Sequence, residues 1–246
     1  MNKLILIIFS SSLLFAATTE EITQYLSFSQ SEQQVLSIER VFDSMRQQQE
    51  NNESNQSTNQ TSIVYQEYLE EHLSSNEIEK ILALYRLPIM ERYVSEIKTF
   101  NINQEDMNAF LENLKEEPLS SERKDIVNEI VKNLVNEELQ LNFYRSMMQR
   151  YQPLKKPKKV DDNASKLSSR EKGYVDSMKE SAKNHLLYGS QILGMEEMIE
   201  LKNALSSSIF QKVKRVENEA LIQIMNNYIQ GIVSKPKELE EKKEKK

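Results

Sequence analysis

Polar start signals and regularly spaced apolar residues follow one another along most of this chain. Ser74 and Glu77 stand three residues apart just before an apolar series, which is the pattern of a capping box at a helix start. The apolar residues that follow recur every three or four positions: Ile78, Ile81, Leu82 and Tyr85. This spacing lines one face of a helix. Pro88 has no N–H and disfavours helical geometry in the residue before it, so we expect the helix to end or kink there and another to begin.

A fainter copy of this arrangement returns 120 residues later. Aligned positions share apolar character or charge: Leu73 with Leu193, Glu77 with Glu197, Ile78 with Met198, Ile81 with Leu201, Ile89 with Ile209 and Arg92 with Lys212. The first copy kinks at Tyr85 and Pro88, whereas the second has Ser208 at the end of a serine run that can end one helix and cap another. The pattern predicts two related helical units.

We therefore predict an all-α fold in which two related kinked-helix units are joined by a long helix. The first unit covers residues 18–118 and contains a polar linker at 46–62. The second unit covers residues 119–234 and contains a polar linker at 154–167. Segments of such polar composition cannot contribute to a core, so both linkers are expected to be mobile.

The joining helix and the C-terminal tail complete the predicted layout. The longest helical pattern begins after Ser121 and ends before Pro153, and we expect it to be one helix between the units. Residues 235–246 are rich in Lys and Glu, which predicts a disordered charged tail.

The composition favours helices and excludes some kinds of site. Four Gly, five Pro and no Trp among 246 residues argue for helices over sheets. The chain has no Cys, so it has neither disulfides nor metal–thiolate sites, and its stability must come from an apolar core. A net charge of −6 disfavours nucleic acid and anionic lipid as default partners.

Residues 1–17 have the features of a secretory signal peptide. Lys3 supplies a positive start, an apolar run follows, and Ala16 and Ala17 form a small-residue exit. The run is shorter than the roughly 20 residues that cross a bilayer, so we predict cleavage between Ala16 and Thr18. The alternative is a retained N-terminal anchor helix. With the signal removed, we expect the mature chain to be a periplasmic protein without a transmembrane span.

The segment around the kink resembles a known bacterial family. Residues 65–93 combine an aromatic and acidic helix, a Ser-x-x-Glu start and the sequence Leu-Tyr-Arg-Leu-Pro-Ile-Met. This stretch resembles the bacterial domain-of-unknown-function 2059 family, whose characteristic segment is Phe-Tyr-x-Ser-Pro-x-Gly. Tyr85 and Pro88 match that segment, whereas Leu87 and Met90 replace its Ser and Gly. The resemblance implies a helical periplasmic protein and supplies no catalytic residues, because the family has no established activity.

No constellation of reactive side chains stands out. The two histidines, His72 and His185, lack the spacing of metal sites, and we interpret both as helix-surface or helix-end residues. The serine runs have no partnered His or elbow glycine, and there is no glycine-rich phosphate loop. The basic cluster at 155–159 is followed by acids, which favours a solvated linker over a nucleic-acid or lipid site. We predict no catalytic residues, no metal and no cofactor.

Asn52, Asn55 and Asn163 each begin an Asn-x-Ser sequon with an acidic residue two positions earlier. These sites resemble the extended sequon of bacterial oligosaccharyltransferases, which act in the periplasm. All three lie in the predicted linkers, and glycosylation needs an exposed segment. The alternative is a chance pattern, because Asn, Ser and Glu are abundant there.

Taken together, the sequence predicts an exported, non-catalytic binding or accessory protein that offers an apolar groove to an envelope protein or a lipid. Methionines on apolar stripes suit such a groove, although filling gaps in a core is their other use. The alternatives are an enzyme whose site only the fold reveals and a purely structural envelope protein. An enzyme should bring perturbed carboxylates or His72 together in a pocket, whereas a binding module should expose a groove. The sequence indicates no oligomeric state.

Overall fold

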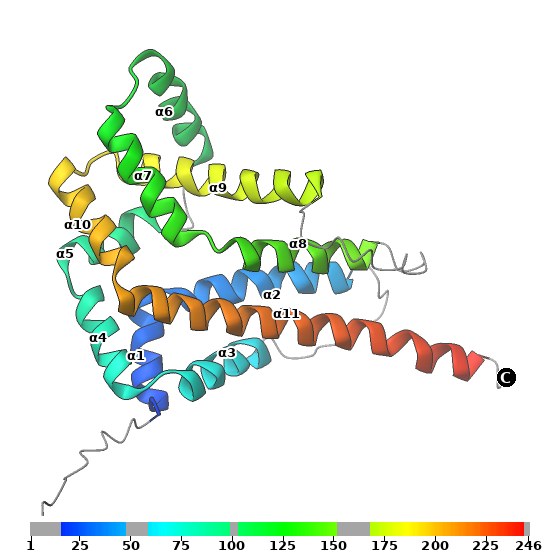
Figure 1. Ribbon diagram of the computed structural model, residues 1–246. Coiled ribbons are helices and arrows are strands. Elements are labelled where there is room, and N and C mark those ends of the chain that lie inside the picture. Colours follow the sequence, from blue (N-terminus) through cyan, green and yellow to red (C-terminus); the bar gives the residue numbers. More distant parts are fainter. Residues whose placement is uncertain (1–15, 48–58, 99–102, 152–167, 244–246) are drawn as a thin grey trace, which may run out of the picture.

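A computed structural model describes residues 16–47, 59–98, 103–151 and 168–243 (Figure 1). Its helices are α1 (Thr19–Ser29), α2 (Ser31–Gln47), α3 (Asn59–His72), α4 (Ser75–Tyr85), α5 (Pro88–Arg92), the π-helical turn η1 (Tyr93–Ile97), α6 (Gln104–Glu116), α7 (Ser121–Leu134), α8 (Glu137–Tyr151), α9 (Ser169–Gly189), α10 (Met195–Ser206) and α11 (Ser208–Lys243). These ranges contain no strand, so the predicted all-α fold is confirmed.

Glutamate side chains cap the starts of α4 and α10 in the same way. At α4, the backbone N–H of Ser74 donates to Glu77 Oε2 over 3.0 Å. At α10, the backbone N–H of Gly194 donates to Glu197 Oε2 over 2.8 Å. Each glutamate satisfies an amide at a helix N-terminus, where acceptors within the helix are missing.

A sharp break follows α4 and α10, and another helix begins directly after it. Leu87 lies between α4 and α5 in an extended conformation, with φ −68° and ψ 136°. Ser207 lies between α10 and α11 with a similar backbone, φ −61° and ψ 146°. Pro88 is the first residue of α5, a position where its missing N–H costs no hydrogen bond.

The predicted long helix between the two units is wrong. The chain leaves the helical conformation at Val135 (φ −92°, ψ 108°), so α7 ends at Leu134 and α8 begins at Glu137. Asn136 Oδ1 accepts a hydrogen bond from the amide of Leu139 over 2.9 Å and caps the start of α8. Asn favours such a cap over a helix interior because its side chain competes for nearby amides.

The C-terminal helix extends further than predicted. α11 continues past Pro236 to Lys243, so residues 235–243 are helical instead of disordered. Lys and Glu are strong helix formers, and lengthening an existing helix needs no new nucleation. The last three residues, 244–246, lie outside the described part.

Both predicted linkers lie largely outside the described residues. α2 ends at Gln47 and α3 begins at Asn59, so the two ends of the 46–62 linker are helical. The 154–167 linker lies outside the description entirely, as do residues 1–15 of the predicted signal peptide.

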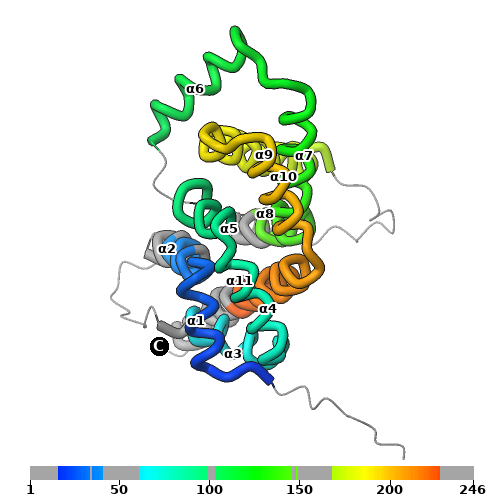
Figure 2. The backbone as a smooth tube through the Cα atoms, turned by 90° about the vertical axis from the view of Figure 1, so that its left-hand side faces the viewer, coloured from blue at the N-terminus to red at the C-terminus, as the bar shows by residue number. Residues whose placement is uncertain are grey.

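α11 runs through the middle of the molecule, where it packs against α3, α4, α8 and α10 (Figure 1). α6 lies at the edge in both views and packs against α9 (Figure 2). The core includes these fully buried residues: Ile22, Leu69, Ile78, Ile81, Met90, Ile130, Met198, Leu201 and Leu205. Met198 and Met225 are buried in this core, so these two methionines fill internal space instead of lining an exposed groove.

Candidate functional site

Glu217 is the most unusual buried residue of the fold. It is 3% exposed, although a glutamate is almost never buried without partners. It lies on the face of α11 that carries buried apolar residues: Val213, Val216, Ala220, Leu221 and Ile224. Its surroundings are therefore the first candidate site.

Groups from three other helices converge on Glu217. The hydroxyl of Tyr25, on α1, donates to Glu217 Oε1 over 2.8 Å. Ser31 of α2 and Tyr65 of α3 also form hydrogen bonds with this carboxylate. Lys214, one turn earlier in α11, places its Nζ 3.1 Å from Oε2. The carboxylate thus links α11 to the first three helices through charge-assisted hydrogen bonds.

Glu217 is ionised and its phenol neighbours are neutral. Burial alone would raise the pKa of Glu217, but the charges of Lys214 and Lys98 and the hydrogen bonds just described outweigh burial and lower the pKa to about 2. Burial, followed by the charge of Glu217, raises the pKa of Tyr25 and Tyr65 well above the usual value. The phenols therefore remain hydrogen-bond donors to the carboxylate at ordinary pH.

The π-helical turn η1 brings Lys98 to the edge of this cluster. The amide of Lys98 donates to the carbonyl of Tyr93, five residues earlier, over 2.7 Å. Its Nζ donates to the carbonyl of Ser29 at the C-terminal end of α1, where a positive charge is favoured. Burial, followed by the charge of Lys214, lowers the pKa of Lys98 to about 8.

The two histidines do not join this cluster. His72 ends α3, is exposed, and stacks on Tyr68 with 3.9 Å between ring centroids. His185 is exposed on α9. Among the described residues, no group of three or more His, Asp or Glu side chains could hold a metal ion.

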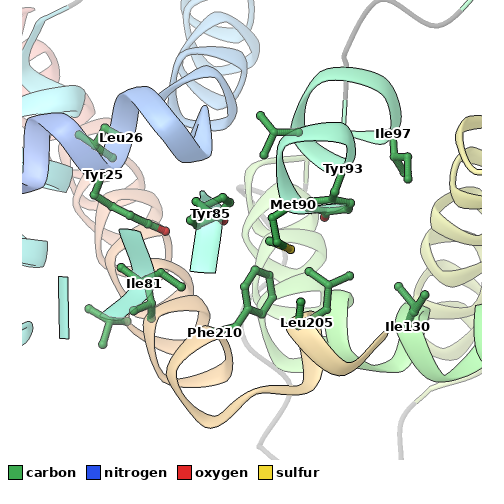
Figure 3. Close-up of a cluster of buried hydrophobic side chains, with 14 of the residues drawn as sticks. Tyr25, Leu26, Ile81, Tyr85, Met90, Tyr93, Ile97, Ile130, Leu205 and Phe210 are labelled. Carbon is green, nitrogen blue, oxygen red and sulfur yellow. The ribbon is translucent and has the colours of Figure 1, made fainter. Parts of the chain in front are cut away.

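The three residues predicted at the kinks lie in two different environments. Tyr85 is buried, and its ring lies 6.0 Å from that of Tyr25 and 6.5 Å from that of Phe210, measured between centroids (Figure 3). Pro88 and Ser208 are exposed at the starts of α5 and α11. The three predicted glycosylation residues lie outside the described part of the chain: Asn52, Asn55 and Asn163.

Sequence reasoning missed Glu217, although a signal was present. Glu217 stands four residues after Val213 and three before Ala220, on the apolar stripe predicted for that helix. A charge at such a position indicates a buried pair. Its partners Tyr25 and Tyr65 could not be found in this way, because no local sequence spacing connects them to α11.

The second candidate site is an open hollow between α7 and α10, with a volume of about 400 Å³. We call it the α7–α10 hollow, and these residues line it: Ser121, Glu122, Asp125, Ile126, Glu129, Ile199 and Lys202. Lys202 Nζ lies 3.3 Å from Glu129 Oε2, so the lysine offsets one of three carboxylates. Ile199 is 38% exposed and supplies apolar surface. The hollow is therefore acidic and partly apolar.

Two further observations bear on the class of protein. None of the helices within the described ranges is both long and apolar enough to cross a membrane. No family model matches the chain, and neither a curated protein nor a solved structure matches it, so the resemblance to the domain-of-unknown-function 2059 family stays a prediction.

Proposed function

We propose that this chain is a non-catalytic binding protein of the cell envelope and that the α7–α10 hollow holds a basic, amphipathic segment of a protein partner. The residues that line the hollow are the main support for this proposal. Glu122 and Asp125 offer negative charge, and Ile199 offers exposed apolar surface beside them. A segment that combines Lys or Arg with apolar residues at regular spacing complements both features.

The charge of the hollow favours a protein over a lipid or a nucleic acid. Three carboxylates and one lysine line it, so the phosphate groups of lipids and nucleic acids are repelled. The net charge of −6 acts in the same direction over a longer range.

The burial of Glu217 argues against a catalytic role for this carboxylate. A general acid or base must come within hydrogen-bond reach of the proton that it transfers. Glu217 is 3% exposed, and Tyr25 and Lys214 each occupy one of its oxygens.

Peptide binding tests the hollow directly. A synthetic amphipathic helix with Lys and Leu at helical spacing should bind, and the same peptide with Glu in place of Lys should not. Reversing two charges of the hollow, in a Glu122→Lys/Asp125→Lys variant, should weaken binding by about tenfold or more, about 1.4 kcal/mol. Calorimetry measures the affinity, and amide chemical shifts should move in α7 and α10.

The matched control changes the same charge elsewhere. Asp176 and Glu180 are exposed on α9, so an Asp176→Lys/Glu180→Lys variant should keep most of the affinity. Equal losses in the two variants would show that the peptide only follows the overall negative charge. Shifts confined to other helices would show that it binds elsewhere.

We also propose export with removal of the signal peptide and glycosylation of the sequons. Ala17 is buried and its amide donates to the carbonyl of Leu73 over 2.9 Å, so of the two predicted starts, Ala17 is the one that retains this contact. The intact mass of the protein from its native host should correspond to a start at Ala17 or Thr18, with added glycan mass. An unmodified mature mass would refute glycosylation, and the mass of the full chain would refute cleavage.

A further inference from the structure

The two halves of the chain contain corresponding helices in the same order. α4 begins at Ser75 and α10 at Met195, and α5 begins at Pro88 and α11 at Ser208, so both pairs of starts are 120 residues apart. Three helices precede each kinked pair, α1 to α3 in the first half and α7 to α9 in the second. α6 lies between the two sets.

Several contacts between helices correspond as well. α3 packs against α1 and α2, and α9 packs against α7 and α8. α4 packs against α1, and α10 packs against α7. Two further pairs of contacts run between the halves. α4 packs against α11, and α10 packs against α5. Likewise, α3 packs against α11, and α9 packs against η1. In each of these pairs, the second contact joins the counterparts of the two helices that form the first contact.

Two ion pairs between the halves are reciprocal. Arg92 of α5 pairs with Glu197 of α10, and Lys212 of α11 pairs with Glu77 of α4. Both carboxylates use Oε1 for the pair and Oε2 to cap their own helix. Contacts of this form, in which each side presents a glutamate and a basic residue at corresponding positions, characterise a two-fold interface.

The apolar residues at the centre of the contact between the halves are also related by the offset of 120 residues. Tyr85 and Leu205 are 120 residues apart, as are Met90 and Phe210, and all four are buried in one cluster (Figure 3). Their positions immediately before and after the two breaks bring the kinks of α4–α5 and α10–α11 together. The kinked pair is therefore the surface through which each half meets the other.

We propose that residues 19–97 and 121–217 are two copies of one five-helix unit, and that the kinked helix pair of each copy is a docking surface whose partner is the same surface of the other copy. The chain is thus an approximately two-fold pair of units joined into one polypeptide through α6. The proposal does not depend on the peptide site described above.

One buried charge makes the two copies unequal. The counterpart of Glu217 is Ile97, which is 5% exposed and apolar, whereas Glu217 is 3% exposed and charged. Tyr25 and Tyr65, from the first copy, satisfy this charge. Pairing of the first copy with the second is therefore preferred over pairing of either copy with itself.

A chain that can be cut between the copies tests this arrangement. A protease recognition sequence inserted between Glu117 and Pro118, which are exposed between α6 and α7, leaves the intact protein as the starting material. After cleavage, the two pieces should elute together in size exclusion, separate in urea and re-form a one-to-one complex when mixed after dilution. Light scattering and mass spectrometry measure the stoichiometry.

Charge-reversed variants of the reciprocal ion pairs test the association of the two pieces. Reversing both bases, in an Arg92→Glu/Lys212→Glu chain, should weaken the association of the cut pieces by about tenfold or more, because each new carboxylate faces a glutamate. The matched control is Lys124→Glu/Lys172→Glu, which makes the same change of charge at exposed positions of α7 and α9. It should change the association by less than about twofold.

A second measurement uses the uncut chain. Double-mutant cycles should give favourable coupling of similar size for Arg92 with Glu197 and for Lys212 with Glu77, and no coupling for Arg92 with Glu77. Coupling in only one of the two cross-pairs would overturn the reciprocal arrangement. Pieces that do not rejoin under conditions in which the uncut chain refolds would overturn the two-copy assignment.

Discussion

Replacing Glu217 with glutamine should lower the free energy of unfolding by about 3–5 kcal/mol, the usual effect of removing one partner from a buried ion pair. Lys214, whose side chain is 18% exposed, then keeps a charge without its counter-charge. Glutamine can still accept the hydrogen bond from Tyr25, so the loss reports mainly on charge. Urea unfolding followed by circular dichroism gives the midpoint and the slope for both proteins.

The difference between wild type and Glu217→Gln should depend on pH. The pKa of Glu217 is about 2 in the folded protein, below its ordinary value of 4.5. A group with a lowered pKa contributes stability that is fully present above the ordinary value and is lost as the pH falls through the folded-state value. The gap between the two unfolding free energies should therefore be constant above pH 4.5 and narrow as the pH falls toward 2.

Two controls separate the buried charge from a general effect of losing a glutamate. Glu79 is exposed on α4, so Glu79→Gln should change the unfolding free energy by less than about 0.5 kcal/mol. A Glu217→Gln/Lys214→Met double variant should lose less stability than the sum of the single losses, because the unpaired ammonium is gone. An unaltered urea midpoint for Glu217→Gln, or an unchanged gap between pH 4.5 and 2, would contradict the assigned role.

The helices could be predicted from sequence wherever local chemistry defines them. Apolar spacing indicated helices throughout, and the Ser74–Glu77 pair and Pro88 indicated where two of them begin. The break between α7 and α8 could not be predicted from spacing, because the apolar residues on both sides pack into one core and keep their rhythm across Val135. Asn136 was the local signal, since its side chain favours a helix start over an interior.

The candidate sites were harder to predict because long-range packing creates them. Glu217 receives hydrogen bonds from three helices that precede it by more than 140 residues. The α7–α10 hollow depends on how two helices lie side by side, which fixes Asp125 and Ile199 on the same surface. Neither site has a sequence motif. Single residues of the two sites can be recognised from the sequence, but the distant residues that contact them cannot.

Two glycines on α9 should respond in opposite directions to the same substitution. A Cβ added at Gly189 would lie 2.9 Å from the Cα of Ile97 and 3.3 Å from the carbonyl oxygen of Glu96, both on the backbone of η1. Gly189→Ala should therefore destabilise the protein by about 1–3 kcal/mol, the usual effect of overpacking. A Cβ at Gly173 meets nothing within 4 Å, so Gly173→Ala should stabilise the helix by about 0.5–1 kcal/mol.

The opposite signs make this pair a test of how α9 meets η1. Helix propensity favours alanine at both positions, so propensity alone predicts two stabilised variants. Only the close backbone approach at Gly189 reverses the sign, and it does so at the contact between the two halves of the chain. Urea midpoints of Gly189→Ala and Gly173→Ala measure the effect. A stabilised Gly189→Ala protein would mean that α9 and η1 lie further apart than their backbones indicate.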